Sequence, residues 1–276
     1  MAVEIRNLSI SFPSAIGPVE VVKRVSLTVG REKVAIVGES GSGKSLTARS
    51  ILKLLPRKAV VTADRLAIDG VDILAANEKT MRAVRGGRAG LIMQDPKYSL
   101  NGFMTVGSQI AEAWREHNGG GWTLAMSAAE NLLERVLIRD PHRVLHAYPH
   151  ELSGGMAQRV MIAMMLAPGP DLLIADEPTS ALDASVQAEI LRLIDELVTT
   201  NGMSLILISH DLPLVSRFCD RVVIMYAGRV MEELAASDLM NARHPYTRSL
   251  LNCLPSMTHP VKRLPTMTRD PDWLAS

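Results

Sequence analysis

The sequence predicts an α/β fold built on a parallel sheet, and two observations support this prediction. Four short runs are almost continuously apolar, as strands are when a parallel sheet is covered on both faces. Patterns with helical spacing lie between these runs, and such alternation is typical of a parallel sheet. The four predicted strands are VAIVG (34–38), AGLIMQ (89–94), DLLIADE (171–177) and SLILISH (204–210).

The first thirty residues are expected to form antiparallel strands outside that sheet. Residues 2–12 and 19–29 alternate between apolar and polar side chains. This alternation is typical of strands that have one face in water. An antiparallel β-region therefore precedes the parallel core.

Helical patterns follow the predicted strands. SLTARSILKLL (45–55) comes soon after the first of them. In QAEILRLIDELV (187–198) one stripe carries the apolar residues Ile190, Leu191, Ile194, Leu197 and Val198. Residues 95–150 contain Gly, Asn, Pro and several helical patches, so we expect a mostly helical insertion with a mobile loop at NGGGW (118–122). The tail, 236–276, carries five prolines and predicts one short helix near 246–254.

Composition limits the classes of function. The chain has 276 residues, 47% of them hydrophobic, with 30 Lys and Arg against 29 Asp and Glu. A net charge of +1 gives no electrostatic reason to expect nucleic acid as the main partner. We expect no signal peptide, because Glu4 and Arg6 interrupt the N-terminus, and no membrane span, which would need about 20 mostly apolar residues. The two cysteines, Cys219 and Cys253, suggest no disulfide framework.

Polar residues end all four predicted strands. They are Gly38, Gln94, Asp176 with Glu177, and His210. In open parallel sheets the ligand lies outside the carboxyl ends of the strands. Four strands therefore bring polar groups to one edge of the sheet.

GESGSGKS (38–45) matches the phosphate-binding pattern G-x-x-x-x-G-K-[ST], and it lies between a predicted strand and a predicted helix, as the pattern requires. Backbone amides from Gly41 to Lys44 would hold the β-phosphate of ATP, Lys44 would neutralise the β- and γ-oxygens, and Ser45 would ligate Mg²⁺. The candidate nucleotide-binding residues are Gly38, Glu39, Ser40, Gly41, Ser42, Gly43, Lys44 and Ser45.

The other strand ends supply candidate catalytic groups. Asp176 would hold Mg²⁺ through water, and Glu177 would act as general base for the attacking water. Gln94 would contact both Mg²⁺ and that water, while His210 would bond the γ-phosphate and orient Glu177. The alternatives are a helix start for the two carboxylates and surface positions for Gln94 and His210.

HELSGGMAQRV (150–160) places Ser153, Gly154 and Gly155 directly before a predicted helix. Serine is a good N-cap, and the glycine pair lets another group approach the backbone closely. A helix N-terminus with bare glycine amides suits an anion.

The ordered set GESGSGKS, Gln94, LSGGM, LLIADEP, SALD (180–183) and His210 resembles the ATP-binding cassette of ABC transporters over about residues 2–235. The resemblance implies a P-loop NTPase with a RecA-like parallel sheet core, an antiparallel β-subdomain and a helical signature subdomain at about 95–165. We therefore expect an ATPase domain over 1–235 and a C-terminal extension over 236–276.

The resemblance also implies roles for particular residues. In such cassettes two subunits pack head to tail, so Ser153, Gly154 and Gly155 would cover the γ-phosphate held by the partner. Phe12 resembles the aromatic residue that stacks on adenine, with a core position in its strand as the alternative.

Two further segments resemble the peptide and nickel importer branch of the family. They are LSGGM followed by AQRVMIAMML, with Met156 where many cassettes have Gln, and RHPYTRSLL (243–251). Many members of this branch carry a cysteine cluster linked to an iron–sulfur centre after that tail. Only Cys253 lies in this region, so no cluster is expected.

The function expected from the resemblance is that of the ATP-hydrolysing subunit of a bacterial importer for oligopeptides, dipeptides, nickel or a related small solute. ATP and Mg²⁺ would be its cofactors. Its partners would be transmembrane permease subunits, contacted through about 95–106, a second ABC ATPase subunit and, indirectly, a solute-binding protein. It would lie peripherally on the cytoplasmic face of the inner membrane.

Two alternatives remain. One is a soluble ABC ATPase that acts on nucleic acid or ribosomes, and the other is a cassette that binds ATP without hydrolysing it.

Overall fold

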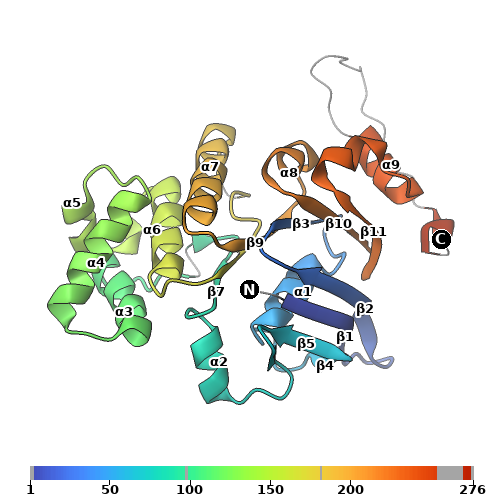
Figure 1. Ribbon diagram of the computed structural model, residues 1–276, viewed down its shortest axis with the longest axis horizontal. Coiled ribbons are helices and arrows are strands. Elements are labelled where there is room, and N and C mark those ends of the chain that lie inside the picture. Colours follow the sequence, from blue (N-terminus) through green and yellow to red (C-terminus); the bar gives the residue numbers. More distant parts are fainter. Residues whose placement is uncertain (1–2, 97–98, 181, 254–269, 275–276) are drawn as a thin grey trace.

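The computed structural model describes residues 3–96, 99–180, 182–253 and 270–274, and within these it contains two sheets (Figure 1). The larger has the strand order β11-β10-β3-β9-β8-β7. All of its neighbouring pairs are parallel except β10 with β11. Its strands are β3 (Lys33–Val37), β7 (Ala89–Ile92), β8 (Leu172–Asp176), β9 (Ser204–Ser209), β10 (Arg221–Tyr226) and β11 (Arg229–Ala235).

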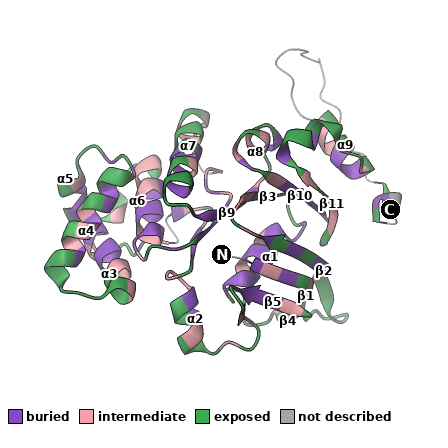
Figure 2. Cartoon of the chain, in the orientation of Figure 1, coloured by how far each residue is buried: buried purple, intermediate pink, exposed green. Residues whose placement is uncertain are grey.

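The predicted parallel sheet is therefore confirmed, and its four predicted strands are neighbours in it. Their continuous apolar character has a simple cause, which strand β9 illustrates. Leu205 and Leu207 belong to the core cluster that includes the helices, whereas Ile206 and Ile208 belong to the cluster shared with the antiparallel sheet and α1 (Lys44–Ile51). Successive side chains point to opposite faces, and packing on both faces leaves β9 buried along nearly all of its length (Figure 2).

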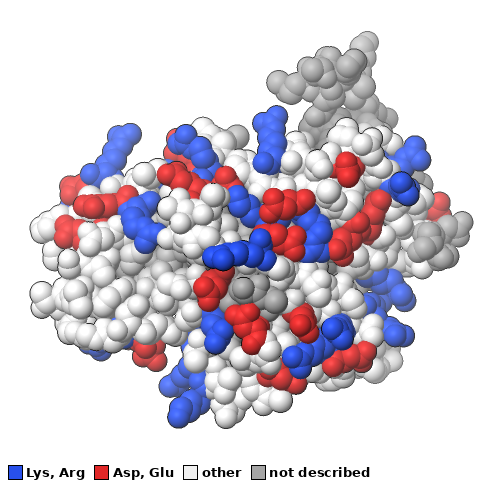
Figure 3. Space-filling view, in the orientation of Figure 1, with Lys and Arg blue, Asp and Glu red and all other residues white. Residues whose placement is uncertain are grey.

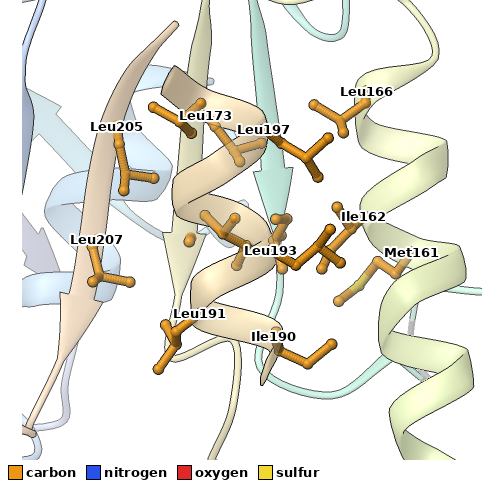
Figure 4. Packing of buried hydrophobic residues seen from close by; sticks show 14 of the residues in the cluster. Met161, Ile162, Leu166, Leu173, Ile190, Leu191, Leu193, Leu197, Leu205 and Leu207 are labelled. Atoms are coloured by element: carbon orange, nitrogen blue, oxygen red, sulfur yellow. The ribbon is translucent and has the colours of Figure 1, made fainter. Parts of the chain in front are cut away.

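The helical face of this sheet is packed by two long helices. Helix α7 (Ala184–Thr200) lies between β8 and β9 on one side and α6 (Gly154–Leu166) on the other (Figure 4). Ile190, Leu193 and Leu197 of α7 face the α6 residues Met161 and Ile162, all of them buried. Burying such aliphatic side chains stabilises the fold by about 1.5–3 kcal/mol each.

The second sheet is antiparallel, as predicted. β1 (Val3–Phe12) pairs with β2 (Val19–Val29), with Val3 opposite Val29 and Phe12 opposite Val19. Its order is β2-β1-β5-β6, and β4 also pairs with β1. The three shorter strands are β4 (Val60–Thr62), β5 (Arg65–Ile68) and β6 (Val71–Asp72). This sheet lies beside α1, on the side of the molecule away from α6 (Figure 1).

Several helices lie within the predicted insertion and gather at one end of the molecule (Figure 1). They are α3 (Val106–Asn118), α4 (Trp122–Arg135), α5 (Pro141–His146) and the short η2 (Pro149–Glu151). Gly119 and Gly120, with φ of 70° and 89°, turn the chain between α3 and α4. The side chains of Thr105 and Asp140 cap α3 and α5.

Other elements depart from the prediction. Helix α1 ends at Ile51 rather than at 55, because Lys53 adopts a left-handed conformation with φ of 54° and the amide of Leu54 bonds back to the Arg49 carbonyl. Elements that the sequence analysis did not predict are β4, β5, β6, β10, β11, α2 (Glu78–Val84), α8 (Leu212–Phe218) and η3 (Ala236–Asn241).

In the tail, a short helix, α9 (Pro245–Asn252), was predicted, and η4 (Pro271–Leu274) follows it. None of the helices in the described ranges has both the length and the hydropathy required to cross a membrane.

Candidate functional site

The loop between β3 and α1 is held tightly against the neighbouring strands. At Gly38, a Cβ atom would lie 2.0 Å from the carbonyl oxygen of Met225, so only glycine fits there. Gly43 has φ of 98°, a conformation that glycine adopts readily, and caps the start of α1. Residues 38–45 therefore form a strand–loop–helix unit that brings backbone N–H groups to a helix N-terminus, an arrangement suited to phosphate.

Lys44 is the first residue of α1, and its side chain folds back over this loop. Its Nζ donates to the carbonyl oxygens of Gly38 and Glu39, each at 2.8 Å, and the residue is buried. Burial lowers the pKa of Lys44, and this effect outweighs the opposing attraction of Glu177, Asp176 and Glu39. The loop thus contains a partly desolvated cation surrounded by acceptors.

Asp176 ends β8, and its side chain is only 3% exposed. Its Oδ1 accepts a hydrogen bond from Ser45 Oγ at 2.6 Å, so the two predicted metal ligands lie side by side. Its Oδ2 accepts two bonds from Arg49, at 2.9 Å from Nη2 and 3.2 Å from Nε. The sequence analysis missed Arg49, although its place one turn after Ser45 on α1 puts it on the same helix face.

Glu177 follows Asp176 and has φ of 47°, which costs a non-glycine residue about 1–3 kcal/mol. Its amide donates to the Ile208 carbonyl of β9 at 3.1 Å, and its carbonyl accepts from Ser180 Oγ. These bonds hold the strained backbone. His210 follows β9, with Nδ1 3.6 Å from Glu177 Oε2, too long for a hydrogen bond but close enough for an ion pair.

A pocket of about 260 Å³ brings several of the predicted residues together. The loop, the segment after β7 and the segment after β8 all contribute to its wall. Its lining comprises Val21, Ser40, Gly41, Gly43, Lys44, Ser45, Leu46, Gln94 and Glu177. Val21 and Leu46 were not predicted, since both are apolar residues within regular elements and carry no local signal. A cation, backbone amides and a carboxylate in one hollow suit chemistry on a bound phosphate.

Other predicted positions are not among the residues that line this pocket: Gly38, Glu39, Ser42, Phe12, Asp176 and His210. Glu39 and Ser42 line a smaller cavity beside the loop. Phe12 packs against the core of the antiparallel sheet and is not among the residues that line this pocket. Asp176 accepts a hydrogen bond from Ser45, which does line the pocket. His210 is 70% exposed beside Glu177.

Residues 153–155, here called the signature turn, are not among those that line the pocket either. Ser153 caps α6, and its Oγ accepts from the amide of Met156 at 3.3 Å. A Cβ on Gly154 would make only ordinary contact with Leu182, at 3.5 Å, whereas one on Gly155 would lie 3.0 Å from Val186. Packing therefore accounts for Gly155, while Gly154 is exposed and remains open to an external group.

Comparison with known proteins agrees with this geometry. A family model described as ABC transporter matches residues 22–180. The probable peptide ABC transporter ATP-binding protein y4tR of Sinorhizobium fredii is 50% identical over 226 residues, 81% of this chain and 68% of that protein. The dipeptide transport ATP-binding protein DppD of Escherichia coli is 45% identical over 263 residues, 95% of this chain and 80% of that protein.

Solved structures agree as well. The dimeric structure of MJ0796, a bacterial ABC transporter cassette, superposes with a TM-score of 0.73 at 25% identity and covers 86% of this chain and 99% of that one. The structure of cbiO1 from Clostridium perfringens, part of the transporter complex cbiONQ, gives a TM-score of 0.70 at 25% identity, with 86% and 91% covered. The predicted P-loop NTPase fold is confirmed, and the chain belongs to the ABC transporter family as one of its ATP-binding subunits, an ATPase.

Proposed function

We propose that this protein is the ATP-hydrolysing subunit of a bacterial importer for dipeptides or oligopeptides. The observation that carries the proposal is the pocket that joins Lys44 and the loop to Gln94 and Glu177. The names of the most similar relatives, which are peptide and dipeptide transport proteins, support peptides as the solute and give no support to nickel.

The nucleotide site is proposed at residues 38–45. The amides from Gly41 to Lys44 bind the β-phosphate, and Lys44 exchanges its present carbonyl acceptors for β- and γ-oxygens. Phe12, near the end of β1, is proposed to contact the adenine. Because Lys44 is partly desolvated, its charge attracts the phosphate more strongly than a fully hydrated lysine would.

The residues of the site also fit Mg²⁺. This ion prefers oxygen ligands, and Ser45 and Asp176 place a hydroxyl and a carboxylate 2.6 Å apart, with the Gln94 amide in the same pocket. When bound, the ion neutralises charge on the β- and γ-phosphates. Arg49 holds the other carboxylate oxygen and thereby fixes the orientation of Asp176.

Hydrolysis is assigned to Glu177 and its neighbours. The Glu177 carboxylate lines the pocket and takes a proton from the attacking water as general base. Gln94, which follows the neighbouring parallel strand β7, orients this water. His210, 3.6 Å from the carboxylate, is proposed to bond the γ-phosphate and to keep Glu177 in position.

Two cassettes are proposed to close head to tail around ATP. The signature turn is exposed and lies outside the nucleotide pocket of its own chain, which leaves it available to a partner's γ-phosphate. The second cassette is another copy of this chain or a paralogue. Residues 1–235 would form the ATPase domain, with the signature carried by a helical part at about 95–165, and 236–276 would form an extension.

Coupling to transmembrane permease subunits is assigned to the segment 95–106. Phe103 in this segment is 96% exposed, an apolar side chain suited to contact with a partner. Lys97 and Tyr98 of the segment lie outside the described residues. The protein would thus lie peripherally on the inner membrane, and a solute-binding protein would act on it through the permease.

Nucleic acid is not proposed as a partner. The charge is nearly balanced overall, and Figure 3 shows basic and acidic side chains interspersed on the face in view. A nucleic-acid-binding face is instead expected to gather Lys and Arg into a patch.

The test is reconstitution in proteoliposomes. The chain is purified with the subunits that accompany it from membranes, and ATP hydrolysis and peptide uptake are measured with and without peptide and its binding protein. Peptide-dependent uptake and hydrolysis support the proposal. Activity that responds to DNA, RNA or ribosomes, with no membrane association when the permease is co-expressed, would favour the soluble alternative.

A further inference from the structure

The C-terminal helix α9 lies against the nucleotide site through an aromatic cluster. Tyr246 of α9 is fully buried, and its ring centroid lies 4.5 Å from that of Tyr226, the last residue of β10. Trp273 of η4 is 6% exposed and completes the cluster, with centroids 5.3 Å from Tyr246 and 5.5 Å from Tyr226. Residues far apart in the sequence therefore form one packed unit.

This cluster contacts the phosphate-binding loop in two ways. The Tyr246 hydroxyl accepts a hydrogen bond from the backbone amide of Glu39 at 3.3 Å. Tyr226 lines a small cavity of about 170 Å³ whose other walls are Glu39, Ser40, Gly41, Ser42 and Ala227. The cluster thus lies directly beside the first half of the loop.

The hydrogen bond leads straight to the lysine of the site. The Glu39 N–H that donates to Tyr246 belongs to the same peptide unit as the Gly38 carbonyl, and that carbonyl accepts from Lys44 Nζ at 2.8 Å. The next carbonyl, that of Glu39, accepts from Lys44 Nζ at 2.8 Å as well. A shift of Tyr246 would therefore move a peptide unit that helps to hold the Lys44 side chain.

The start of α9 is itself anchored to the cassette. Glu232 of β11 accepts from the amide of Arg243 at 2.7 Å and from that of His244 at 3.2 Å. Burial alone would raise the pKa of Glu232, but the nearby Thr247 side chain and the hydrogen bonds from these two amides hold that pKa below its usual value. His244 in turn accepts from the Tyr246 amide through Nδ1, at 3.1 Å. The Tyr246 side chain is thus held at its hydroxyl by the Glu39 amide and at its backbone by the anchored start of α9.

We propose that Tyr246 is a positioning residue for the phosphate-binding loop, and that α9 thereby sets the affinity of the site for nucleotide. The inference rests on the proposed nucleotide site at residues 38–45. A loop held in place before ATP arrives loses less conformational freedom on binding, so the tether raises affinity. Linkage requires the reverse effect as well: bound ATP must stabilise α9 by the same factor.

The first test compares Tyr246→Phe with Ser249→Ala. The first variant removes one hydroxyl and leaves the ring in the aromatic cluster, while the second removes a hydroxyl from the same helix. We expect Tyr246→Phe to raise the Kd and the KM for ATP about two- to tenfold, the range for one hydrogen bond, with kcat in the assembled transporter within twofold of wild type. Ser249→Ala should match wild type.

Glu232→Gln provides a second route, because it loosens the start of α9 without touching Tyr246 or the loop. Glu232→Gln should raise the KM for ATP as Tyr246→Phe does. It keeps the proposal testable if Tyr246→Phe does not fold. A kcat that falls together with affinity in both variants, or an unchanged affinity in both, would overturn the proposal.

The reciprocal test is amide hydrogen exchange of the full chain with and without ATP. Saturating ATP should slow exchange in α9 of the wild type, and the slowing should diminish in Tyr246→Phe. Lys44→Ala distinguishes a failure of the proposed nucleotide site from a failure of the role proposed for Tyr246. If that variant retains full ATP affinity, the proposed nucleotide site is wrong; if it loses affinity while ATP leaves α9 unprotected in the wild type, the site stands and the role of Tyr246 is refuted.

Discussion

The phosphate-binding loop and the signature turn are both glycine-rich segments before a helix, yet the first is enclosed by its own chain and the second is exposed. The loop is surrounded by its own chain: Lys44 bonds to two loop carbonyls, and Met225 allows no side chain at Gly38. The signature turn is exposed at Ser153 and Gly154, and nothing closer than ordinary contact restricts a side chain at Gly154.

The difference shows that the same local chemistry serves two purposes. Both helices present N–H groups without intrahelical partners. Around the loop, the chain adds a cation, the proposed metal ligands and a carboxylate, so the proposed nucleotide site is complete within one chain apart from its cover. The signature turn contributes none of the residues that line that pocket, which is the arrangement expected for a surface that another cassette uses.

The largest expected effect is at the pocket beside the phosphate-binding loop. Glu177→Gln should lower turnover about 10²–10⁴-fold, because it removes the general base, while ATP affinity stays near wild type. Phosphate release and ATP titration measure the two quantities. Glu196→Gln, an exposed change on α7, is the matched control. Turnover of Glu177→Gln close to wild type would contradict the assignment.

Gly154→Asp tests whether the signature turn receives the γ-phosphate of a partner cassette. A carboxylate about 4 Å from a partner's γ-phosphate costs roughly 4 kcal/mol at an effective dielectric near 20, so ATP-driven dimerisation should weaken by about three powers of ten. The isolated variant should still bind ATP. Gly154→Ala, which places only a Cβ 3.5 Å from Leu182, separates charge from size and should still dimerise. Normal dimerisation with poor ATP binding by the Asp variant would mean that the turn serves its own chain's nucleotide.

Lys44→Ala tests whether the closed loop depends on its cation. A hydrogen bond to a charged group contributes about 1.5–3 kcal/mol, so ATP affinity should fall roughly 10- to 150-fold and hydrolysis with it. Calorimetric titration gives the affinity, and Lys79→Ala, an exposed lysine on α2, is the control. Unchanged affinity would show that the loop has a structural role only.

Ser153→Ala gives the smallest effect and sharpens the comparison. The variant loses the hydrogen bond that Ser153 Oγ accepts from the Met156 amide, and loss of an N-cap costs about 0.5–2 kcal/mol of unfolding free energy. Urea unfolding measures this loss, and Ser153→Thr should recover most of it. ATP affinity of the monomer should not change; a fall would place the turn in its own chain's site.

Much of the fold was predictable because its signals are local. The apolar runs at 34–38 and 204–210 became β3 and β9, since strands covered on both faces need apolar residues at every position. Helix α1 was predicted too long, because a lysine gives no sign that it will adopt the left-handed conformation seen at Lys53. Strands β10 and β11 were missed although Ala227 and Gly228 form a tight turn between them.

By itself, the sequence determined the chemistry that the loop and the strand ends would carry, because a glycine pattern and a polar residue after a buried strand act within a few residues. Only the tertiary structure decided how these groups meet. Arg49 pairs with Asp176 across 127 positions, and Tyr246 meets Glu39 across 207. Such contacts depend on which strands become neighbours and on where a tail packs, and the free energy that selects them belongs to the whole core rather than to any short segment.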